Sequence, residues 1–178
     1  NHFDQSDGSG KAGICFGMKG LLKDYLSMYY ESYDYRGCWN SSRTRLTMID
    51  AMPNSMPTEL YSVIKSVDLY TNGYNDGANG GMLKTEDKVF IPSEKELGRE
   101  NTTDDYSTKF PIFSNDNSRI KKFNGYAEQY WTRTYITYSE GGDDSEPSYG
   151  FGIVDTSGAL NTSQDSWASN RICFCFNV

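Results

Sequence analysis

The fold is clearest in the segment Gly150-Phe151-Gly152-Ile153-Val154-Asp155-Thr156-Ser157-Gly158 of this 178-residue chain. Trp131-Thr132-Arg133 precedes it, and Arg171-Ile172-Cys173-Phe174-Cys175-Phe176 lies near the C-terminus. Each segment is rich in aromatic or β-branched residues, and turn residues separate them, a pattern typical of strands. The sequence therefore predicts a strand-rich last third.

A helix is predicted near the N-terminus, well before these strands. Apolar residues recur there at intervals of three and four, which places them on one face of an amphipathic helix. We expect this helix to end before the turn near Gly37. The residues of its apolar face are Met18, Leu21, Leu22, Tyr25, Leu26 and Tyr29.

Two short helices joined by a proline turn are expected next. Ser41 or Ser42 is placed to cap the first of them, and Pro53 to stop it. Pro57 suits the first turn of the second helix, where a backbone N–H is not needed. A strand over residues 67–71 follows. The predicted inward-facing residues are Leu46, Ile49 and Met52 in the first helix and Leu60, Val63 and Ile64 in the second.

The middle of the chain is expected to be rich in loops. Residues 71–81 are dominated by Gly and Asn and show no hydrophobic period, which predicts a long loop. A short strand is predicted over residues 88–91. Ser93 and Glu96 then have the spacing of a capping box, which predicts the start of a helix. Further loops are predicted over residues 98–118, 139–148 and 157–169.

The domain organisation is simple. Residues 1–13 are polar and rich in Gly and Ser, a composition typical of a flexible linker or terminus. No internal repeat or boundary interrupts residues 14–178, which are long enough to bury a core. We therefore expect a single α+β domain there.

The composition favours a folded, acidic protein. Aromatic residues make up 15% of the chain and include 14 Tyr, whereas disordered segments are poor in aromatics. The net charge of −7 disfavours nucleic acid and anionic membranes as partners, since both need a basic face. No apolar run approaches the ~18 residues of a spanning helix, so membrane insertion is not expected.

Several segments also resemble a known family. They are Trp39-Asn40-Ser41-Ser42-Arg43, residues 57–64, residues 88–96, residues 131–133 and the terminal strand. Together they are similar to DUF6273, an uncharacterised bacterial and phage domain family whose C-terminal half resembles C-type lectins and formylglycine-generating enzymes. The resemblance implies a C-type-lectin-like α+β fold, with short N-terminal helices packed on a small twisted antiparallel sheet with long loops. The chain departs from the family at Arg171-Ile172-Cys173-Phe174, where Val-Arg-Pro is usual.

Cysteine and histidine offer little for catalysis. Cys15, Cys38, Cys173 and Cys175 are either buried free thiols or form one or two disulfides reaching Cys15 or Cys38. His2 is the single histidine, so the sequence holds no zinc signature, Ser-His-Asp triad or Cys-His pair. We expect no catalytic residues. Because formylglycine-generating enzymes use cysteines near their C-terminus, the resemblance leaves that activity as a third functional hypothesis.

An acidic loop is the candidate metal site. Asp143, Asp144 and Glu146 place three carboxylates within four residues, and Ca²⁺ binds several oxygens from a flexible loop. Sugar-binding C-type lectins carry a Glu-Pro-Asn or related triplet here, whereas this chain has Glu146-Pro147-Ser148 and lacks their Trp-Asn-Asp motif. The alternative is a solvated acidic loop without metal. No other cofactor is expected.

Trp39, Trp131 and Arg133 have two interpretations. In one, the aromatic rings form a sugar-binding platform and Arg133 adds a polar contact. In the other, both tryptophans pack in the core and Arg133 braces a neighbouring loop. We favour the second interpretation, because these residues mark the family fold and no particular ligand.

The C-terminal loops are the predicted binding surface. They combine rigid aromatic side chains with short hydrogen-bonding ones, a composition that recognition loops favour. The candidate ligand-binding residues are Tyr135, Tyr138, Tyr149, Asn161, Gln164, Asp165, Trp167 and Asn170.

Together with these loops, the resemblance implies a non-enzymatic recognition domain of a phage virion (tail tip, fibre or head decoration) or of a bacterial surface protein. The expected ligand is a cell-surface glycan or protein, with sister copies or virion subunits as further partners. The expected location is the virion, the extracellular space or the cell surface. The alternative is a purely structural assembly module, whose exposed aromatic residues would spread over a flat patch.

Overall fold

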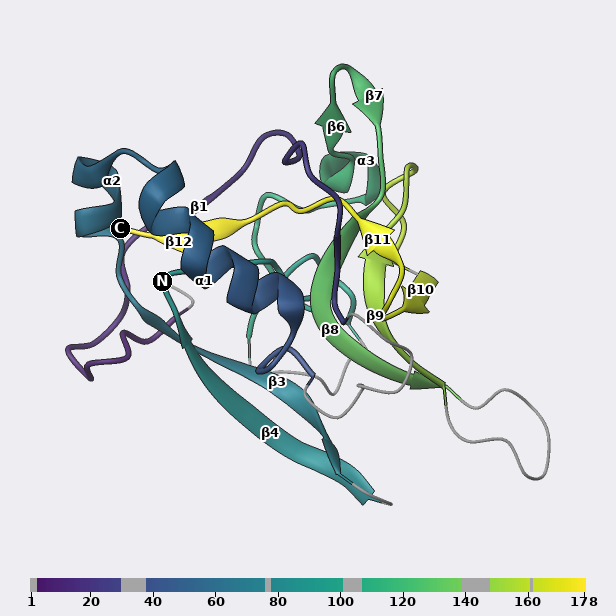
Figure 1. Cartoon of the computed structure of the whole chain (residues 1–178), viewed down its shortest axis with the longest axis horizontal. Helices are drawn as coiled ribbons and strands as arrows, with labels where there is room; N and C mark the ends of the chain where they lie inside the picture. Colours follow the sequence, from purple (N-terminus) through teal and green to yellow (C-terminus); the bar gives the residue numbers. More distant parts are fainter. Residues whose placement is uncertain (1–2, 30–37, 76–77, 101–106, 139–147, 161) are drawn as a thin grey trace.

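Strands β8 (Tyr130–Tyr138) and β9 (Ser148–Val154) form the centre of the C-terminal half (Figure 1). They pair antiparallel, with Trp131 opposite Ile153, and β10 (Thr162–Asp165) pairs with the other edge of β9. This arrangement confirms the strands expected around Trp131 and Ile153. The computed structural model describes residues 3–29, 38–75, 78–100, 107–138, 148–160 and 162–178.

The other strands form further small antiparallel sheets in the described residues. The sheet with the order β1-β12-β5 consists of β1 (Cys15–Gly17), β12 (Cys175–Asn177) and β5 (Val89–Phe90). The two-stranded sheets are β3 (Val67–Asn75) with β4 (Ala78–Asp87), β6 (Lys122–Phe123) with β7 (Tyr126–Ala127), and β2 (Leu26–Ser27) with β11 (Ser169–Asn170). The fold is therefore a mixed α+β arrangement of short, open, antiparallel sheets.

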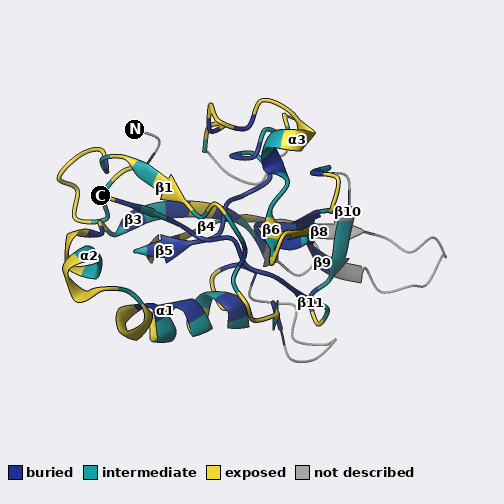
Figure 2. Ribbon diagram, turned by 90° about the horizontal axis from the view of Figure 1, so that it is seen from above, coloured by how far each residue is buried: buried dark blue, intermediate teal, exposed yellow. Residues whose placement is uncertain are grey.

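The helix α1 (Arg43–Ser55) is capped by Ser42, whose hydroxyl accepts a hydrogen bond from the Arg45 N–H. Its buried stripe is Thr44, Met48 and Met52, at i, i+4 and i+8. The prediction of its inner face was therefore wrong for Leu46 and Ile49, which are 49% and 43% exposed. The stripe follows the four-residue spacing because one side of α1 packs on β5 and β2 (Figure 2).

Prolines mark the ends of the helices less sharply than expected. Pro53 lies inside α1, and the helix continues to Ser55. The helix α2 (Thr58–Val63) begins after Pro57, as predicted, but Val63 is exposed and the burial is at Ile64, just past its end. The third helix, α3 (Asp116–Arg119), is a single turn capped by Asn115 within a segment expected to be a loop.

The predicted helix over residues 18–29 does not form. Its backbone N–H groups bond to distant parts of the chain: Met18 to the Phe174 carbonyl, Leu21 to that of Lys122, and Leu22 to that of Ile172. Only Leu26 and Ser27 have regular structure, as the strand β2. The apolar spacing is that of a helix, but backbone hydrogen bonds to the C-terminal half replace the helical ones.

Two other local predictions also differ from the structure. The Gly/Asn segment expected to be a loop is mostly the β3–β4 hairpin, with a register shift after Asn72. Ser93 and Glu96 make both reciprocal hydrogen bonds of a capping box, at 2.9 and 3.2 Å, yet only a turn follows. The capping signal was therefore right about the hydrogen bonds and wrong about the helix.

The core joins both halves of the chain in one hydrophobic cluster. Residues 3–13, expected to be a linker, contribute Phe3 and Ala12 to it, and the Phe3 ring packs edge-on against Phe90 with 5.0 Å between centroids. Figure 2 shows this buried layer between α1 and the opposite side, where α3 lies. No helix in the described residues is long and apolar enough to cross a bilayer.

Candidate functional site

Trp39, Trp131 and Arg133 are packing residues. All three are almost fully buried. The Trp39 indole N–H donates to Asp87 Oδ2 at 3.1 Å, and the Trp131 indole N–H donates to the Leu26 carbonyl at 2.7 Å. Arg133 donates to the Ile91 carbonyl at 2.9 Å and so braces the turn after β5. This arrangement supports the packing interpretation over a sugar platform at these residues.

The predicted ligand-binding residues separate into three groups. Tyr135 is buried and packs edge-on against Phe151, with ring centroids 5.6 Å apart, which removes it from a surface site. The side chains of Tyr138, Tyr149 and Asn161, and the calcium candidates Asp143, Asp144 and Glu146, lie outside the described residues. The residues that remain near one another are Gln164, Asp165, Trp167 and Asn170.

Trp167 occupies a turn between β10 and β11. Its side chain is 47% exposed, whereas the other two tryptophans of the chain are buried. The Ala168 N–H donates to the Asp165 carbonyl at 2.9 Å and closes the turn. The Ser166 carbonyl, in turn, accepts from the Tyr29 N–H at 2.9 Å. These bonds fix the backbone on both sides of an exposed indole ring.

A chain of three amide side chains lies beside this turn. The Gln129 amide donates to Asn170 Oδ1, and Asn170 Nδ2 donates to Gln164 Oε1, each at 2.6 Å. Asn170 is fully buried, while Gln129 and Gln164 are partly exposed. The buried amide therefore orients two polar groups toward the surface.

Tyr25 presents a second exposed aromatic ring at the other end of the β2–β11 pair. It is 52% exposed, and its hydroxyl donates to Glu128 Oε2. Arg171 binds the same carboxylate through Nε and Nη2, at 2.6 and 3.1 Å. The guanidinium also lies 4.2 Å from the Tyr25 ring centroid and 3.8 Å from that of Phe123. These contacts hold the Tyr25, Glu128 and Arg171 side chains in one orientation and place the guanidinium charge against the carboxylate charge.

The hydrogen bonds of this cluster shift the pKa values of Glu128 and Tyr25. Hydrogen bonds from Arg171 and then from Tyr25 lower the pKa of Glu128, because both favour the carboxylate. The bond to Glu128 raises the pKa of the Tyr25 hydroxyl, since ionisation would set two anions side by side. Glu128 is thus an anion and Tyr25 a neutral donor at neutral pH.

We call this surface the aromatic–amide face. Its exposed rings can stack on the apolar faces of sugar rings, and its amides and carboxylate can bond hydroxyl groups. The sequence predicts Trp167, Gln164 and Asn170 as binding residues but not Tyr25, whose spacing places it on the apolar face of a predicted helix. No local signal links Glu128, Gln129 and Arg171 to them, because strand pairing brings them together. This surface consists of two hydrogen-bonded clusters, Tyr25, Glu128 and Arg171 and then Gln129, Asn170 and Gln164, together with Trp167 on the adjacent turn.

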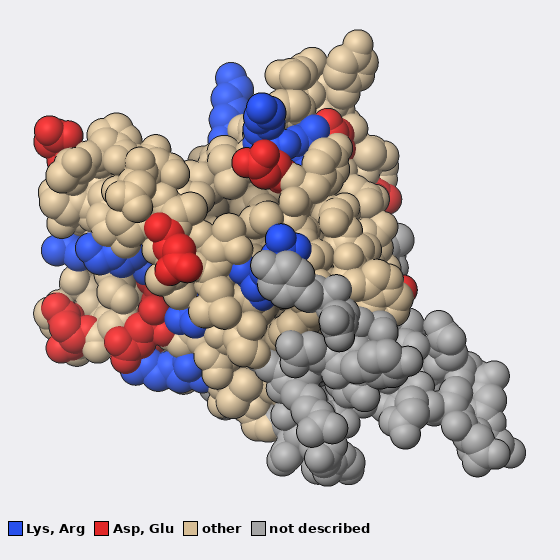
Figure 3. Space-filling view, viewed as in Figure 1, with Lys and Arg blue, Asp and Glu red and all other residues tan. Residues whose placement is uncertain are grey.

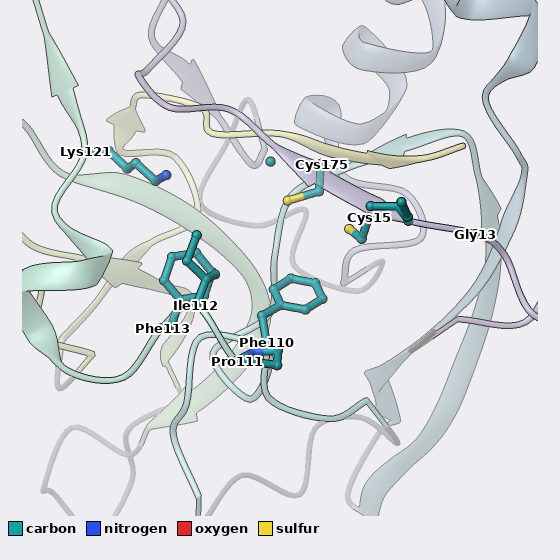
Figure 4. Close-up of a pocket in the computed structure, with 10 residues that line it drawn as sticks. Gly13, Cys15, Phe110, Pro111, Ile112, Phe113, Lys121 and Cys175 are labelled. Carbon is teal, nitrogen blue, oxygen red and sulfur yellow. The ribbon is translucent and has the colours of Figure 1, made fainter.

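A second feature is an apolar pocket of about 470 Å³ beside β1 (Figure 4). One wall is β1 with Gly13 and Ile14, and the other is the segment from Phe110 to Phe113. Cys15 and Cys175 point into it, and Lys121 is the one charged residue that lines it among the described residues.

All four cysteines are free thiols. Cys38, Cys173 and Cys175 are buried, whereas Cys15 is partly exposed. Burial raises the pKa of Cys173 to about 11, and a hydrogen bond with Cys15 followed by burial raises the pKa of Cys175. Such thiols stay protonated at neutral pH, which disfavours nucleophilic chemistry at these positions. In the part of the chain that the structure describes, no three His, Cys, Asp or Glu residues form a potential metal site.

Comparison with known proteins identifies the family of the chain. The described structure is a mixed α+β domain of small antiparallel sheets. Residues 17–178 match the model of the family described as Domain of unknown function (DUF6273), and the chain belongs to that family. No curated protein and no solved structure matches the chain.

Proposed function

We propose that this domain is a non-enzymatic recognition module that binds a cell-surface glycan through the aromatic–amide face. The domain would be part of a phage virion or of a bacterial surface protein. The observation that carries the proposal is the exposed Trp167 ring on a hydrogen-bonded turn beside an oriented amide chain.

Exposure and rigidity together favour a binding role. The other two tryptophans are buried and satisfied, so the half-exposed Trp167 is the exception in this chain. A rigid aromatic side chain offers a large contact area and loses little entropy when it binds. Gln164 and Gln129 supply amides whose orientation is set before a ligand arrives.

The two exposed rings suggest a ligand longer than one sugar. Tyr25 and Trp167 lie at opposite ends of the β2–β11 pair, with Leu26 opposite Asn170 and Ser27 opposite Ser169. Four residues of extended chain span about 13 Å. A glycan that contacts both rings would therefore have to be an oligosaccharide.

Charge favours a neutral glycan over a polyanion. The chain carries a net charge of −7. Figure 3 shows basic and acidic residues interspersed on the face in view, without a continuous basic patch among the described residues. Arg171, on the aromatic–amide face, is already paired with Glu128.

The test is binding of the labelled domain to a glycan array and to intact bacterial cells. Trp167→Ala should abolish saturable binding, whereas Phe16→Ala should leave it unchanged, since Phe16 is also 47% exposed but lies on β1, in another sheet. Equal binding by both variants, or no binding at high micromolar concentration, would overturn the proposal. Loss of cell binding after protease treatment would indicate a protein ligand instead. Repeating the assay with calcium and with chelator tests the loop of Asp143, Asp144 and Glu146.

A structural assembly module is the second candidate, and the exposed apolar side chains of the helices favour it. Leu46 and Ile49 are adjacent on α1, and Val63 lies on α2. If sister copies pack through these helices, the domain should self-associate in light scattering. Leu46→Asp should then restore the monomer without affecting glycan binding.

A further inference from the structure

The strand β1 has one paired edge and one open edge. On the paired side, Ile14 and Val178 exchange N–H···O bonds of 2.9 and 3.1 Å, and the Met18 N–H donates to Phe174 O at 3.0 Å. Backbone groups alternate in direction along a strand, so those of Cys15 and Gly17 point away from β12. Within the described residues, no strand pairs with that edge, because β1 is the end strand of its sheet.

The apolar pocket lies along this open edge. Cys15 and Gly17 line it together with the segment from Phe110 to Phe113, and Cys175 lies on its inner side (Figure 4). Ile112, on the wall opposite β1, is 74% exposed, and Ile14 is 68% exposed. An open strand edge next to an apolar pocket is the arrangement that binds extended peptides, since the backbone bonds the edge and a side chain fills the pocket.

Lys121 sets the charge of this site. Its ammonium donates to the Met18 carbonyl at 2.7 Å and lies 5.8 Å from the Phe113 ring centroid. An ammonium has three N–H donors, so it can bind a carboxylate in addition to that carbonyl. Lysine in an otherwise apolar pocket favours a partner with an apolar side chain close to an acidic one.

We infer that β1 binds an extended segment of a partner protein as an added strand. One apolar side chain of the segment fills the pocket, and an Asp or Glu side chain of the same segment contacts Lys121. The occupant we propose is a segment of another protein, selected by the positive charge of Lys121 in an otherwise apolar pocket, and a second copy of the chain is the alternative that the experiment tests. This site lies on a different sheet from the aromatic–amide face and goes beyond the proposed glycan binding.

The experiment measures fluorescence anisotropy of a labelled peptide with acetylated and amidated ends. The peptide alternates Val and Thr and contains one Leu and one Glu two residues apart, so that both side chains lie on the same side of the added strand. Ile112→Asp should weaken its binding about tenfold or more by charging the pocket wall. Leu46→Asp, the same type of change at an exposed residue of α1, should have no effect. An N-methylated peptide, which cannot pair with the strand edge, should not bind.

Charge pairing is tested by a double-mutant cycle. Lys121→Gln should weaken binding of the Glu peptide about two- to fivefold and leave that of a Gln peptide unchanged. The Trp167→Ala variant should bind the peptide as wild type does. Failure of the glycan proposal is therefore distinguishable from failure of the peptide-binding proposal. Equal binding by wild type and Ile112→Asp would overturn the inference. Dimerisation of the free domain that Ile112→Asp abolishes would also overturn it, since the occupant would then be a second copy.

Discussion

Arg133 and Glu96 form a two-pronged ion pair in the core. Arg133 Nη1 lies 2.6 Å from Glu96 Oε2, and Nη2 lies 2.5 Å from Oε1. Both side chains are at most 1% exposed. Glu96 Oε2 also accepts the Ser93 N–H at 2.9 Å. The pair therefore joins β8 to the turn that follows β5.

Breaking this pair should be costly. Arg133→Met leaves the Glu96 carboxylate buried without its countercharge, so we expect a loss of about 3–5 kcal/mol in the free energy of unfolding. Urea denaturation measures it. The double variant Arg133→Met/Glu96→Met should lose less than the sum of the single variants. Strict additivity would show that the two groups do not interact.

The Glu128 carboxyl should make the stability of the fold depend on pH in the acidic range. Its pKa is lowered in the folded state, first by Arg171 and then by Tyr25, relative to the ordinary value of 4.5. The stabilisation that the ionised Glu128 gives to the fold is therefore present above that value and is lost as the pH falls through the lower pKa of the folded state. Thermal denaturation between about pH 6 and 2.5 should show a smaller acid-dependent drop for Glu128→Gln than for wild type. Glu59→Gln, in an exposed part of α2, is the control and should follow wild type.

Thiol labelling should be limited to one residue in the native protein. Cys15 is partly exposed, whereas the pKa of Cys173 is raised to about 11 and that of Cys175 is also raised. A chromogenic disulfide reagent at about pH 8 should label one thiol rapidly, and Cys15→Ser should remove this phase. Rapid labelling that Cys173→Ser or Cys175→Ser removes would contradict the burial and would revive the formylglycine-generating hypothesis.

Two glycines provide a matched test of close packing. Gly158 and Gly125 both have a φ of +87°, so alanine strains the backbone equally at each. At Gly125 a Cβ meets open space, and the expected cost is about 1–2 kcal/mol. At Gly158 it would lie 1.9 Å from the Asp116 carbonyl oxygen, so Gly158→Ala should cost markedly more or prevent folding. Equal denaturation midpoints would show that the α3 segment moves aside freely.

The sequence alone was sufficient where a signal depends on neighbouring residues. The Ser42 cap and the strands around Val67, Trp131 and Ile153 are found as expected, and Pro57 stands one position before its predicted place, at the N-cap of α2. Each results from a local steric or hydrogen-bonding preference that the fold does not oppose. The same composition also predicted Trp167 as a surface aromatic.

Tertiary structure alone determined the rest, because pairing between distant residues outweighs local preference. The apolar spacing around Leu21 and Leu22 is helical, but their N–H groups bond to carbonyls more than 100 residues away. Asn170 was expected to touch a ligand, yet it is buried between Gln129 and Gln164 and orients them. Net charge, caps and strand composition are properties of the sequence. Which side chains meet at a binding surface depends on how the sheets assemble, since each contact gains free energy only when both partners are already in place.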